Sequence, residues 1–296
     1  MSIPFKTQLQ NYQDRLHEVL PNLYLGGHST PDATDEAALY SLMAGGKRIR
    51  PVLSLAVGKT LNVCESVLLP FACAIEMIHT YSLIHDDLPC MDNDDLRRGR
   101  PTCHKQFSEA IALLAGDSLL NRAFEIALDT CLSGKQEAVT AAVFLASASG
   151  NRGMIGGQTM DILSEGKKIS AETLHDLHSK KTGALLRASV MVPVILSTET
   201  SITEAFSRFA SHLGVAFQIK DDLLDTLSTT DKLGKTVGKD AKDHKSTFVT
   251  LFGIDQAEKI LARETAAAYE ALMEIGKTKD VRFLMDLNQY LLSREN

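Results

Sequence analysis

Long segments with apolar residues spaced three and four apart constrain the fold of this chain more than any other feature. These segments are rich in Ala, Leu, Met, Glu and Lys, whereas strict alternation of apolar and polar residues is scarce. Segments 66–87, 107–131 and 201–227 carry apolar residues on most faces, as expected for helices buried at the centre of a bundle. We therefore predict an all-α protein, with residues 1–296 forming one large helical bundle. The predicted helices span about 3–20, 32–44, 49–60, 66–87, 107–131, 135–150, 153–164, 171–197, 201–227, 244–252, 255–275 and 278–293.

Composition narrows the class of protein and of ligand. Of the 296 residues, 44% are hydrophobic and 23% are charged, which is typical of a globular protein and excludes a disordered chain. The net charge of −6 provides no general attraction to nucleic acid or to an anionic membrane surface. We expect no nucleic-acid partner, and an anionic ligand must be bound by local groups.

Cysteine usage and hydropathy bear on the compartment. The five cysteines form no CxxC pair, and their odd number makes a disulfide framework unfavourable. The first twenty residues lack the composition of a signal or transit peptide, and Glu76 interrupts the most apolar stretch. We therefore expect a cytoplasmic location without membrane insertion.

Five aspartates and two arginines lie close together between residues 85 and 98. The Leu88-Pro89 pair is expected to end the preceding helix near Asp87, because proline lacks an amide donor and restricts the residue before it. The chain can then bring Asp92 back towards Asp86.

A second aspartate cluster, Asp221-Asp222-Leu223-Leu224-Asp225, ends another apolar helix. Asp221 and Asp225 are i, i+4 neighbours on one helical face. Carboxylates this close repel each other, so a cation must neutralise them if they are to stay ionised in a cleft. Few, hard oxygen ligands suit Mg²⁺ better than zinc.

Basic groups accompany both clusters. They are the GGKRIRP segment at 45–51, Arg97-Arg98, Lys180-Lys181-Thr182-Gly183, the GKTVGKD segment at 234–240 and Lys245. Either aspartate cluster alone is equally compatible with a solvated acidic helix end. Two clusters with neighbouring phosphate-binding groups instead favour a site for metal and diphosphate.

These motifs and their order resemble the trans-isoprenyl diphosphate synthases, and among them the bacterial-type farnesyl diphosphate synthases. The resemblance runs from about residue 30 to the C-terminus. Its anchors are GGKRIRP at 45–51, HDDLPCMDNDDLRRGRPTCH at 85–104, GDSLL at 116–120, GGQTMDI at 156–162, KTGALL at 181–186, FQIKDDLLD at 217–225 and GKTVGKD at 234–240.

The resemblance implies a bundle of the isoprenoid synthase type, with central antiparallel helices around a deep cleft, and a role for each motif residue. The implied ligands of three Mg²⁺ ions are Asp86, Asp92 and Asp221, assisted by Asp87, Asp222 and Asp225. The implied clamp on the allylic diphosphate is Arg97, Lys181, Lys235 and Lys245. The implied pocket for isopentenyl diphosphate is Gly46, Lys47, Arg50, His79 and Arg98. The implied dipoles that stabilise a carbocation are those of Thr182, Gln218 and the Lys181 carbonyl.

The implied reaction is Mg²⁺-assisted ionisation of the allylic diphosphate, followed by condensation and elimination. The isopentenyl double bond attacks the allylic cation, and a proton is then lost to the released diphosphate. The family also implies a homodimer. Dimethylallyl and then geranyl diphosphate would each accept one C5 unit and give farnesyl diphosphate.

Product length is predicted from the helix before the first cluster. Tyr81 lies five residues before Asp86, and its ring, with Ser82 beside it, can close the end of the tail pocket. A core aromatic without influence on length is the alternative interpretation. The resemblance favours a C15 product, with a geranylgeranyl synthase or a mixed C10–C20 synthase as alternatives.

Two further functions remain open. A terpene cyclase is disfavoured because its second metal motif normally contains Asn, Ser or Thr and Glu, which DDLLD lacks. An inactive regulatory subunit of a prenyl synthase is the non-enzymatic alternative.

Three smaller predictions concern residues near the motifs. His85 is expected to orient the Asp86 carboxylate by a hydrogen bond. Lys220 is assigned no role. The loop 234–240 and the C-terminal tail are hypothesised to close over substrate.

Overall fold

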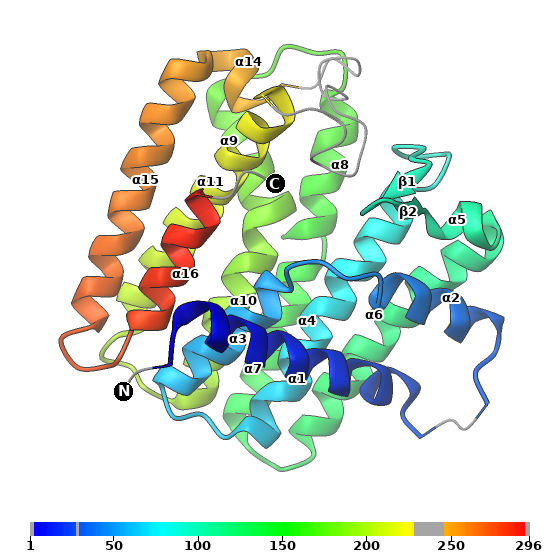
Figure 1. Cartoon of the computed structure of the whole chain (residues 1–296), viewed down its shortest axis with the longest axis horizontal. Helices are drawn as coiled ribbons and strands as arrows, with labels where there is room; N and C mark the ends of the chain where they lie inside the picture. The colour runs from blue at the N-terminus through cyan, green and yellow to red at the C-terminus, as the bar shows by residue number, and fades with distance from the viewer. Residues whose placement is uncertain (1–2, 28–29, 228–245, 294–296) are drawn as a thin grey trace.

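The computed structural model describes residues 3–27, 30–227 and 246–293, which form helices and one small hairpin (Figure 1). The elements before the hairpin are α1 (Phe5–Leu25), α2 (Ala33–Leu42), α3 (Ile49–Thr60) and α4 (Glu65–Asp86). The hairpin pairs β1 (Leu96–Arg97) with β2 (Arg100–Pro101). After it come α5 (Cys103–Gln106), α6 (Glu109–Cys131), α7 (Gln136–Ser149), α8 (Met154–Ser164) and α9 (Ala171–His178). The remaining elements are the π-helical turn η1 (Ser179–Gly183), α10 (Ala184–Ser197), α11 (Thr203–Leu227), α14 (Phe248–Phe252), α15 (Ile254–Ile275) and α16 (Arg282–Ser293).

Local side chains explain where several helices begin and end. Asp32 caps α2 in a reciprocal capping box with Asp35, and the Ser108 hydroxyl accepts the Ile111 amide at the start of α6. Gly26 ends α1 in the left-handed conformation, which costs glycine little. These signals are local in sequence, which is why the helices are predictable.

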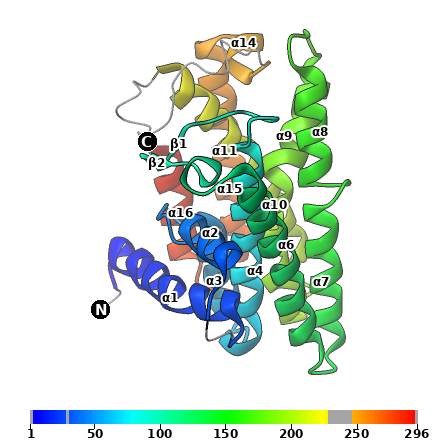
Figure 2. The same cartoon turned by 90° about the vertical axis from the view of Figure 1, so that its right-hand side faces the viewer.

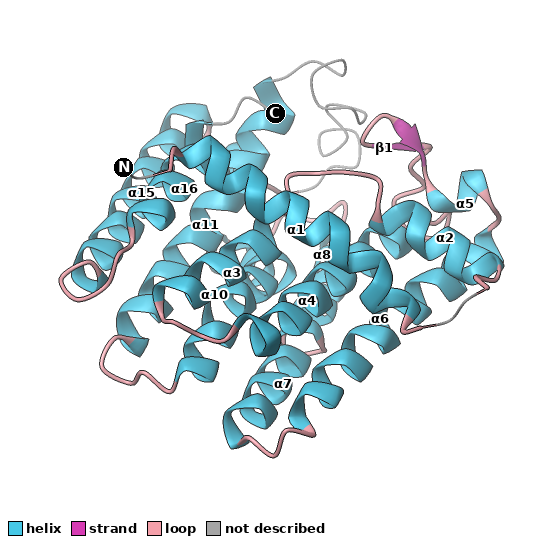
Figure 3. Cartoon of the chain, turned by 60° about the horizontal axis from the view of Figure 1, so that its bottom comes forward, coloured by secondary structure: helices cyan, strands magenta, loops and turns pink. Residues whose placement is uncertain are grey.

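The helices pack in layers around α4 and α10. The α4 helix contacts α3, α6 and α10, while α10 also contacts α7 and α11, and α11 contacts α15. Figures 1 and 3 show α1 crossing one face of this arrangement, and Figure 2 shows α7 and α8 on the opposite side. One apolar core runs through these layers, and a smaller cluster lies beneath α9, α14 and α15.

The α4 helix is apolar enough and long enough to cross a membrane, alone among the helices of the described residues. In the structure 72% of its most apolar window is buried inside the protein. Phe71, Ile75 and Met77 are inaccessible to solvent and belong to the main core. Each such side chain contributes about 1.5–3 kcal/mol by leaving water, so α4 is a core helix.

The all-α prediction is confirmed, and the differences are local. The first helix continues through Pro21 to Leu25, beyond the predicted end at residue 20. The predicted helix 171–197 is interrupted by η1. The hairpin and α5 were not predicted, and the start of the predicted helix 244–252 lies outside the described residues.

Candidate active site

The first aspartate cluster sits where α4 ends. The Asp92 amide donates to the Asp86 carbonyl oxygen at 2.8 Å, and the Asn93 amide donates to the Leu88 carbonyl at 3.1 Å. These bonds turn the chain back on itself directly after the helix. The predicted return of Asp92 towards Asp86 is thus confirmed.

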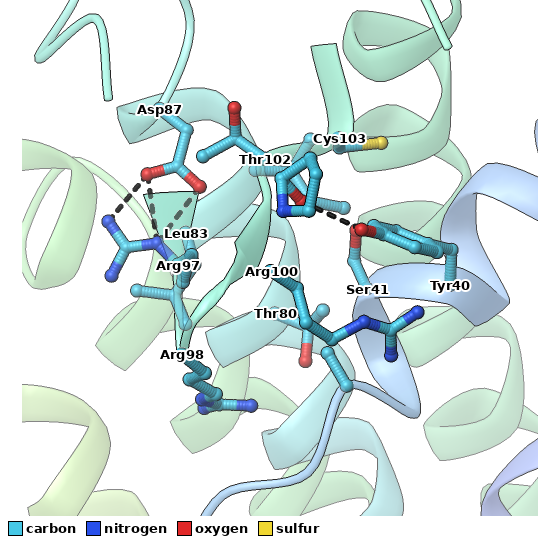
Figure 4. Close-up of a pocket in the computed structure, with 13 residues that line it drawn as sticks. Tyr40, Ser41, Thr80, Leu83, Asp87, Arg97, Arg98, Arg100, Thr102 and Cys103 are labelled. Atoms are coloured by element: carbon cyan, nitrogen blue, oxygen red, sulfur yellow. Dashed lines mark hydrogen bonds and ion pairs between the residues drawn. The ribbon is translucent and has the colours of Figure 1, made fainter. Parts of the chain in front are cut away.

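The two-stranded hairpin then brings Arg97 back to the cluster. Arg98 and Gly99 both have positive φ, 54° and 74°, as a two-residue hairpin turn requires. The Arg97 guanidinium binds both carboxylate oxygens of Asp87, with nitrogen–oxygen distances of 2.6–2.9 Å. Figure 4 shows this pair beside a narrow cavity of about 30 Å³ that also borders Tyr40 and Cys103. Arg97 therefore neutralises the buried Asp87. Asp86 lines a different, larger cavity.

The surroundings of Asp86 disfavour the ionised form of its carboxyl group. The pKa of Asp86 is raised to about 6, chiefly by burial; Asp92 and Asp87 contribute to the rise, and Lys181 and Arg97 oppose it. Its Oδ1 accepts a hydrogen bond from the Gln158 amide at 2.8 Å. A divalent cation bound here would lower the pKa of Asp86 again, because it favours the ionised form.

The second cluster lies on α11, in a chain of hydrogen bonds. The Thr182 hydroxyl donates to Gln218 Oε1, and Gln218 Nε2 donates to Asp222 Oδ1, both at 2.8 Å. The other Asp222 oxygen accepts the Phe248 amide at 2.8 Å. Asp222 thereby fixes the Gln218 side chain.

The donor set suits a hard cation shared between helices. Within residues 3–27, 30–227 and 246–293, no three His, Cys, Asp or Glu side chains form a metal cluster by themselves. The carboxylates instead come from the ends of α4 and α11. Mg²⁺ is commonly held this way, by one or two carboxylates together with water and substrate phosphate oxygens.

Lys181 and Thr182 are carried by the π-helical turn η1, between α9 and α10. Such turns widen a helix by one residue and are frequent at functional sites. The Lys181 ammonium contacts Asp161 Oδ2 on α8 at 2.5 Å. The turn thus directs consecutive side chains, a cation and a hydroxyl, towards the same cleft.

A second basic group gathers at the start of α3. The Arg50 guanidinium lies 3.4 Å from His79 Nε2, and Arg98 donates to the Gly45 carbonyl. Burial lowers the pKa of His79 well below its ordinary value, and the nearby Arg50 and Arg98 add to the effect. His79 is therefore neutral and accepts from Arg50.

Gly46 and Lys47 complete this group with different degrees of constraint. Gly46 has a φ of 103°, and a Cβ there would collide with the Arg98 guanidinium. Lys47 is half-buried, and its carbonyl accepts from Gln13. Arg48, by contrast, is buried and pairs with Glu76 at 2.6 Å, so it stabilises the fold.

A cavity of about 340 Å³ lies between α4, α8 and the π-helical turn η1 and is also lined by Arg50 of α3. Its lining includes the predicted site residues Arg50, His79, Tyr81, Ser82, Asp86, Lys181 and Thr182. Asp87, Arg97 and Arg98 instead line the narrow cavity of Figure 4. The remaining predicted residues among those described, Gly46, Lys47, Asp92, Gln218, Asp221, Asp222 and Asp225, are not part of either lining. Lys235, Lys245 and the loop 234–240 lie outside the described residues.

Sequence reasoning missed the contribution of α8 to this cavity. Met154, Ile155, Gln158, Thr159 and Ile162 all line it. The GGQTMDI motif was the available signal, but its side chains suggested no chemistry without their partners.

The prediction for His85 is corrected by the structure. Its Nε2 lies 3.0 Å from the Leu113 carbonyl oxygen on α6, and its ring occupies the space above Gly116. His85 therefore holds α4 against α6 and does not orient Asp86. The absence of a side chain at Gly116 leaves the space that the ring occupies.

Comparison with known proteins agrees with this arrangement. The family model "Polyprenyl synthetase" matches residues 31–285. The chain is 40% identical to the farnesyl diphosphate synthase of Micrococcus luteus, with 97% of each chain covered. It is 43% identical to a chloroplastic geranylgeranyl pyrophosphate synthase of Capsicum annuum, over 90% of this chain and 73% of that one.

A solved structure resembles the whole molecule. The geranyltransferase of Helicobacter pylori, complexed with magnesium and isoprenyl diphosphate, superposes with a TM-score of 0.84 at 31% identity. The alignment covers 99% of this chain and 97% of that one. This chain belongs to the polyprenyl synthetase family.

Proposed function

We propose that this chain is a prenyltransferase that condenses dimethylallyl and then geranyl diphosphate with isopentenyl diphosphate to give (2E,6E)-farnesyl diphosphate. One observation carries the proposal: a single cavity is lined both by Asp86 and Lys181, which we call its polar end, and by the buried Tyr81 ring. In the proposed complex the diphosphate binds at the polar end and the apolar tail packs beside Tyr81. The 40% identity to a farnesyl diphosphate synthase supports the same product.

Magnesium fits the residues at the polar end. We propose that Asp86, Asp92 and Asp221 hold three ions together with the diphosphate, with Asp87, Asp222 and Asp225 assisting. The ions would make the diphosphate a better leaving group by withdrawing its negative charge. The raised pKa of the buried Asp86 supports this site, as does the magnesium complex of the Helicobacter pylori relative.

The basic residues have distinct roles in the proposed reaction. Lys181 binds the allylic diphosphate, with Arg97, Lys235 and Lys245 as its companions. Gly46, Lys47, Arg50, His79 and Arg98 bind isopentenyl diphosphate. The neutral His79 adds no further positive charge to this group, so its part is to accept from Arg50 and keep that guanidinium in place.

The carbocation formed when the allylic C–O bond breaks needs nearby dipoles that point their negative ends towards it. The Thr182 hydroxyl gives its proton to Gln218 Oε1, so its oxygen lone pairs are directed away from Gln218. Asp222 fixes the Gln218 amide from the other side. We propose that Thr182, Gln218 and the Lys181 carbonyl stabilise the cation. The isopentenyl double bond then attacks it, and the departing diphosphate accepts the released proton.

We also propose that the chain works as a homodimer and as one domain over residues 1–296. Several exposed apolar side chains belong to α6, α7 and α8, three helices that lie together on one side of the molecule in Figure 2. They include Leu113, Leu128, Val143, Ile155 and Leu163. An apolar surface of this kind is characteristic of an interface between subunits. We propose a cytoplasmic location, which the five free thiols support.

The direct experiment incubates the purified chain with dimethylallyl diphosphate, isopentenyl diphosphate and Mg²⁺. Farnesyl diphosphate as the main product, lost when the metal is chelated, is the expected result. No product from these two substrates would favour the inactive-subunit alternative. Sedimentation velocity of the same preparation tests the dimer.

A further inference from the structure

The α8 helix contacts both sides of the polar end of the cleft. Gln158 on α8 donates to the Asp86 carboxylate at 2.8 Å, and Asp161 accepts from the Lys181 ammonium at 2.5 Å. The two residues are i, i+3 neighbours and so occupy one face of the helix. A single helix face therefore touches the carboxylate of one wall and the cation of the other.

Gly157 sets the distance between α8 and the π-helical turn. A Cβ at this position would lie 2.1 Å from the Lys181 amide nitrogen and 2.5 Å from its Cα. These are backbone atoms, so no side-chain rotation could relieve the collision. Only glycine lets α8 approach the turn closely enough for Asp161 to reach Lys181.

The pair with Asp161 restricts a flexible side chain. A lysine has about 2 kcal/mol of rotamer entropy, and its ammonium carries three donors. The side chains of Lys181 and Asp161 are 25% and 16% exposed, so water screens their attraction less than at the surface. One donor is engaged by Asp161, and the others are available to phosphate oxygens. The Gln158 amide likewise engages one Asp86 oxygen only.

We propose that Gln158 and Asp161 are positioning residues, which hold Asp86 and Lys181 in the orientation that receives a metal-bound diphosphate. The inference rests on the proposed function, because it assigns the same two residues to that ligand. A competing reading makes opposite predictions. If Asp161 merely competed with diphosphate for Lys181, its removal would strengthen diphosphate binding.

The test for Asp161 uses the full chain and inorganic diphosphate as the probe. Isothermal titration with Mg²⁺ present should give a Kd for diphosphate about tenfold higher in Asp161→Ala, or about 1.4 kcal/mol. In steady-state assays the KM for geranyl diphosphate should rise similarly, while the KM for isopentenyl diphosphate stays within twofold. Asp161→Asn keeps an acceptor oxygen and should recover part of the loss.

Asp176→Ala is the matched control. Asp176 pairs at 2.7 Å with Lys180, the residue before Lys181, but neither Asp176 nor Lys180 lines the cleft. This variant removes a carboxylate–lysine pair from the same segment and should leave both constants unchanged. A tighter Kd in Asp161→Ala, or a lower Tm with unchanged Kd and KM, would overturn the proposal for Asp161.

Gln158→Leu tests the other contact. It keeps the side-chain bulk but removes the amide that holds Asp86, so the Mg²⁺ concentration at half-maximal diphosphate binding should rise about tenfold. Thr140→Val is the control, because Thr140 on α7 makes the same kind of bond, to the Gln136 carbonyl, and does not line the cavity. An unchanged Mg²⁺ requirement in Gln158→Leu contradicts its role. A wild-type chain that binds Mg²⁺-diphosphate yet forms no product would instead refute the proposed function.

Discussion

His178, the last residue of α9, should make the protein sensitive to acid. Both of its ring nitrogens are buried without a hydrogen-bond partner among the described residues, and its ring stacks on Phe248 at 5.5 Å. The pKa of His178 is lowered from 6.5 to about 4, chiefly by burial; Asp161 opposes this shift, whereas Lys181 and His175 contribute to it. The imidazole is therefore neutral in the folded protein near neutral pH.

The cost of acid follows from the difference between the folded and unfolded pKa values. Because the folded pKa is the lower one, the unfolded chain binds more protons below pH 6.5, and stability falls until the folded pKa is reached. For pKa values of 6.5 and about 4, the loss between pH 7.5 and 4.5 is about 2.5 kcal/mol. This loss corresponds to roughly 5 °C in Tm for a chain of this size.

His178→Phe retains an aromatic ring against Phe248 but cannot be protonated. Urea unfolding of wild type and variant at pH 7.5 and 4.5 separates this group from all other titrations, which are common to both proteins. The variant should lose about 2.5 kcal/mol less than wild type between the two pH values. The control is His175→Phe, because His175 is exposed on the same helix. Equal acid losses in wild type and His178→Phe would refute the reasoning.

Two further variants test how the cleft is supported. Tyr40→Phe removes the 2.8 Å bond from the hydroxyl to the Pro101 carbonyl, which anchors the hairpin carrying Arg98 (Figure 4). The KM for isopentenyl diphosphate should rise about threefold to tenfold, whereas the control Tyr24→Phe should leave it unchanged; equal effects would show that the bond is irrelevant to binding. Thr182→Val removes the cleft hydroxyl, so kcat should fall at least about tenfold, or 1.4 kcal/mol of barrier. If kcat is preserved, Thr182 does not stabilise the cation.

The helices were predictable because their apolar periodicity extends over many residues. The hairpin was not, since strands of only two residues are too short to show alternation, and an isolated hairpin of this size is not stable without outside contacts. Its contacts come from Asp87 and Tyr40, which are distant in sequence or lie on other elements. The π-helical turn was missed because a turn of five residues within a longer helical segment does not change the apolar periodicity from which helices are predicted.

The site was predicted in part. The motifs indicated the aspartates, Lys181 and Thr182, and the structure places several of them around one cavity. The motifs could not reveal that Asp87 pairs with Arg97, because this pairing depends on the hairpin turn. Nor could they reveal the partners of Gln158 and Asp161, which lie on other helices. Pairings between residues on different elements cannot be predicted from the neighbouring residues in the sequence.

Product length tests the central claim most directly, because it depends on a cleft that both binds diphosphate and ends at Tyr81. Tyr81 is 5% exposed and lines the cavity, and its ring lies 5.6 Å from that of His85. Wild type and Tyr81→Ala should be incubated with dimethylallyl diphosphate, excess isopentenyl diphosphate and Mg²⁺, and their products separated by chain length. The account predicts C15 from wild type and C20 or longer products from the variant. Unchanged C15 output from Tyr81→Ala would contradict it.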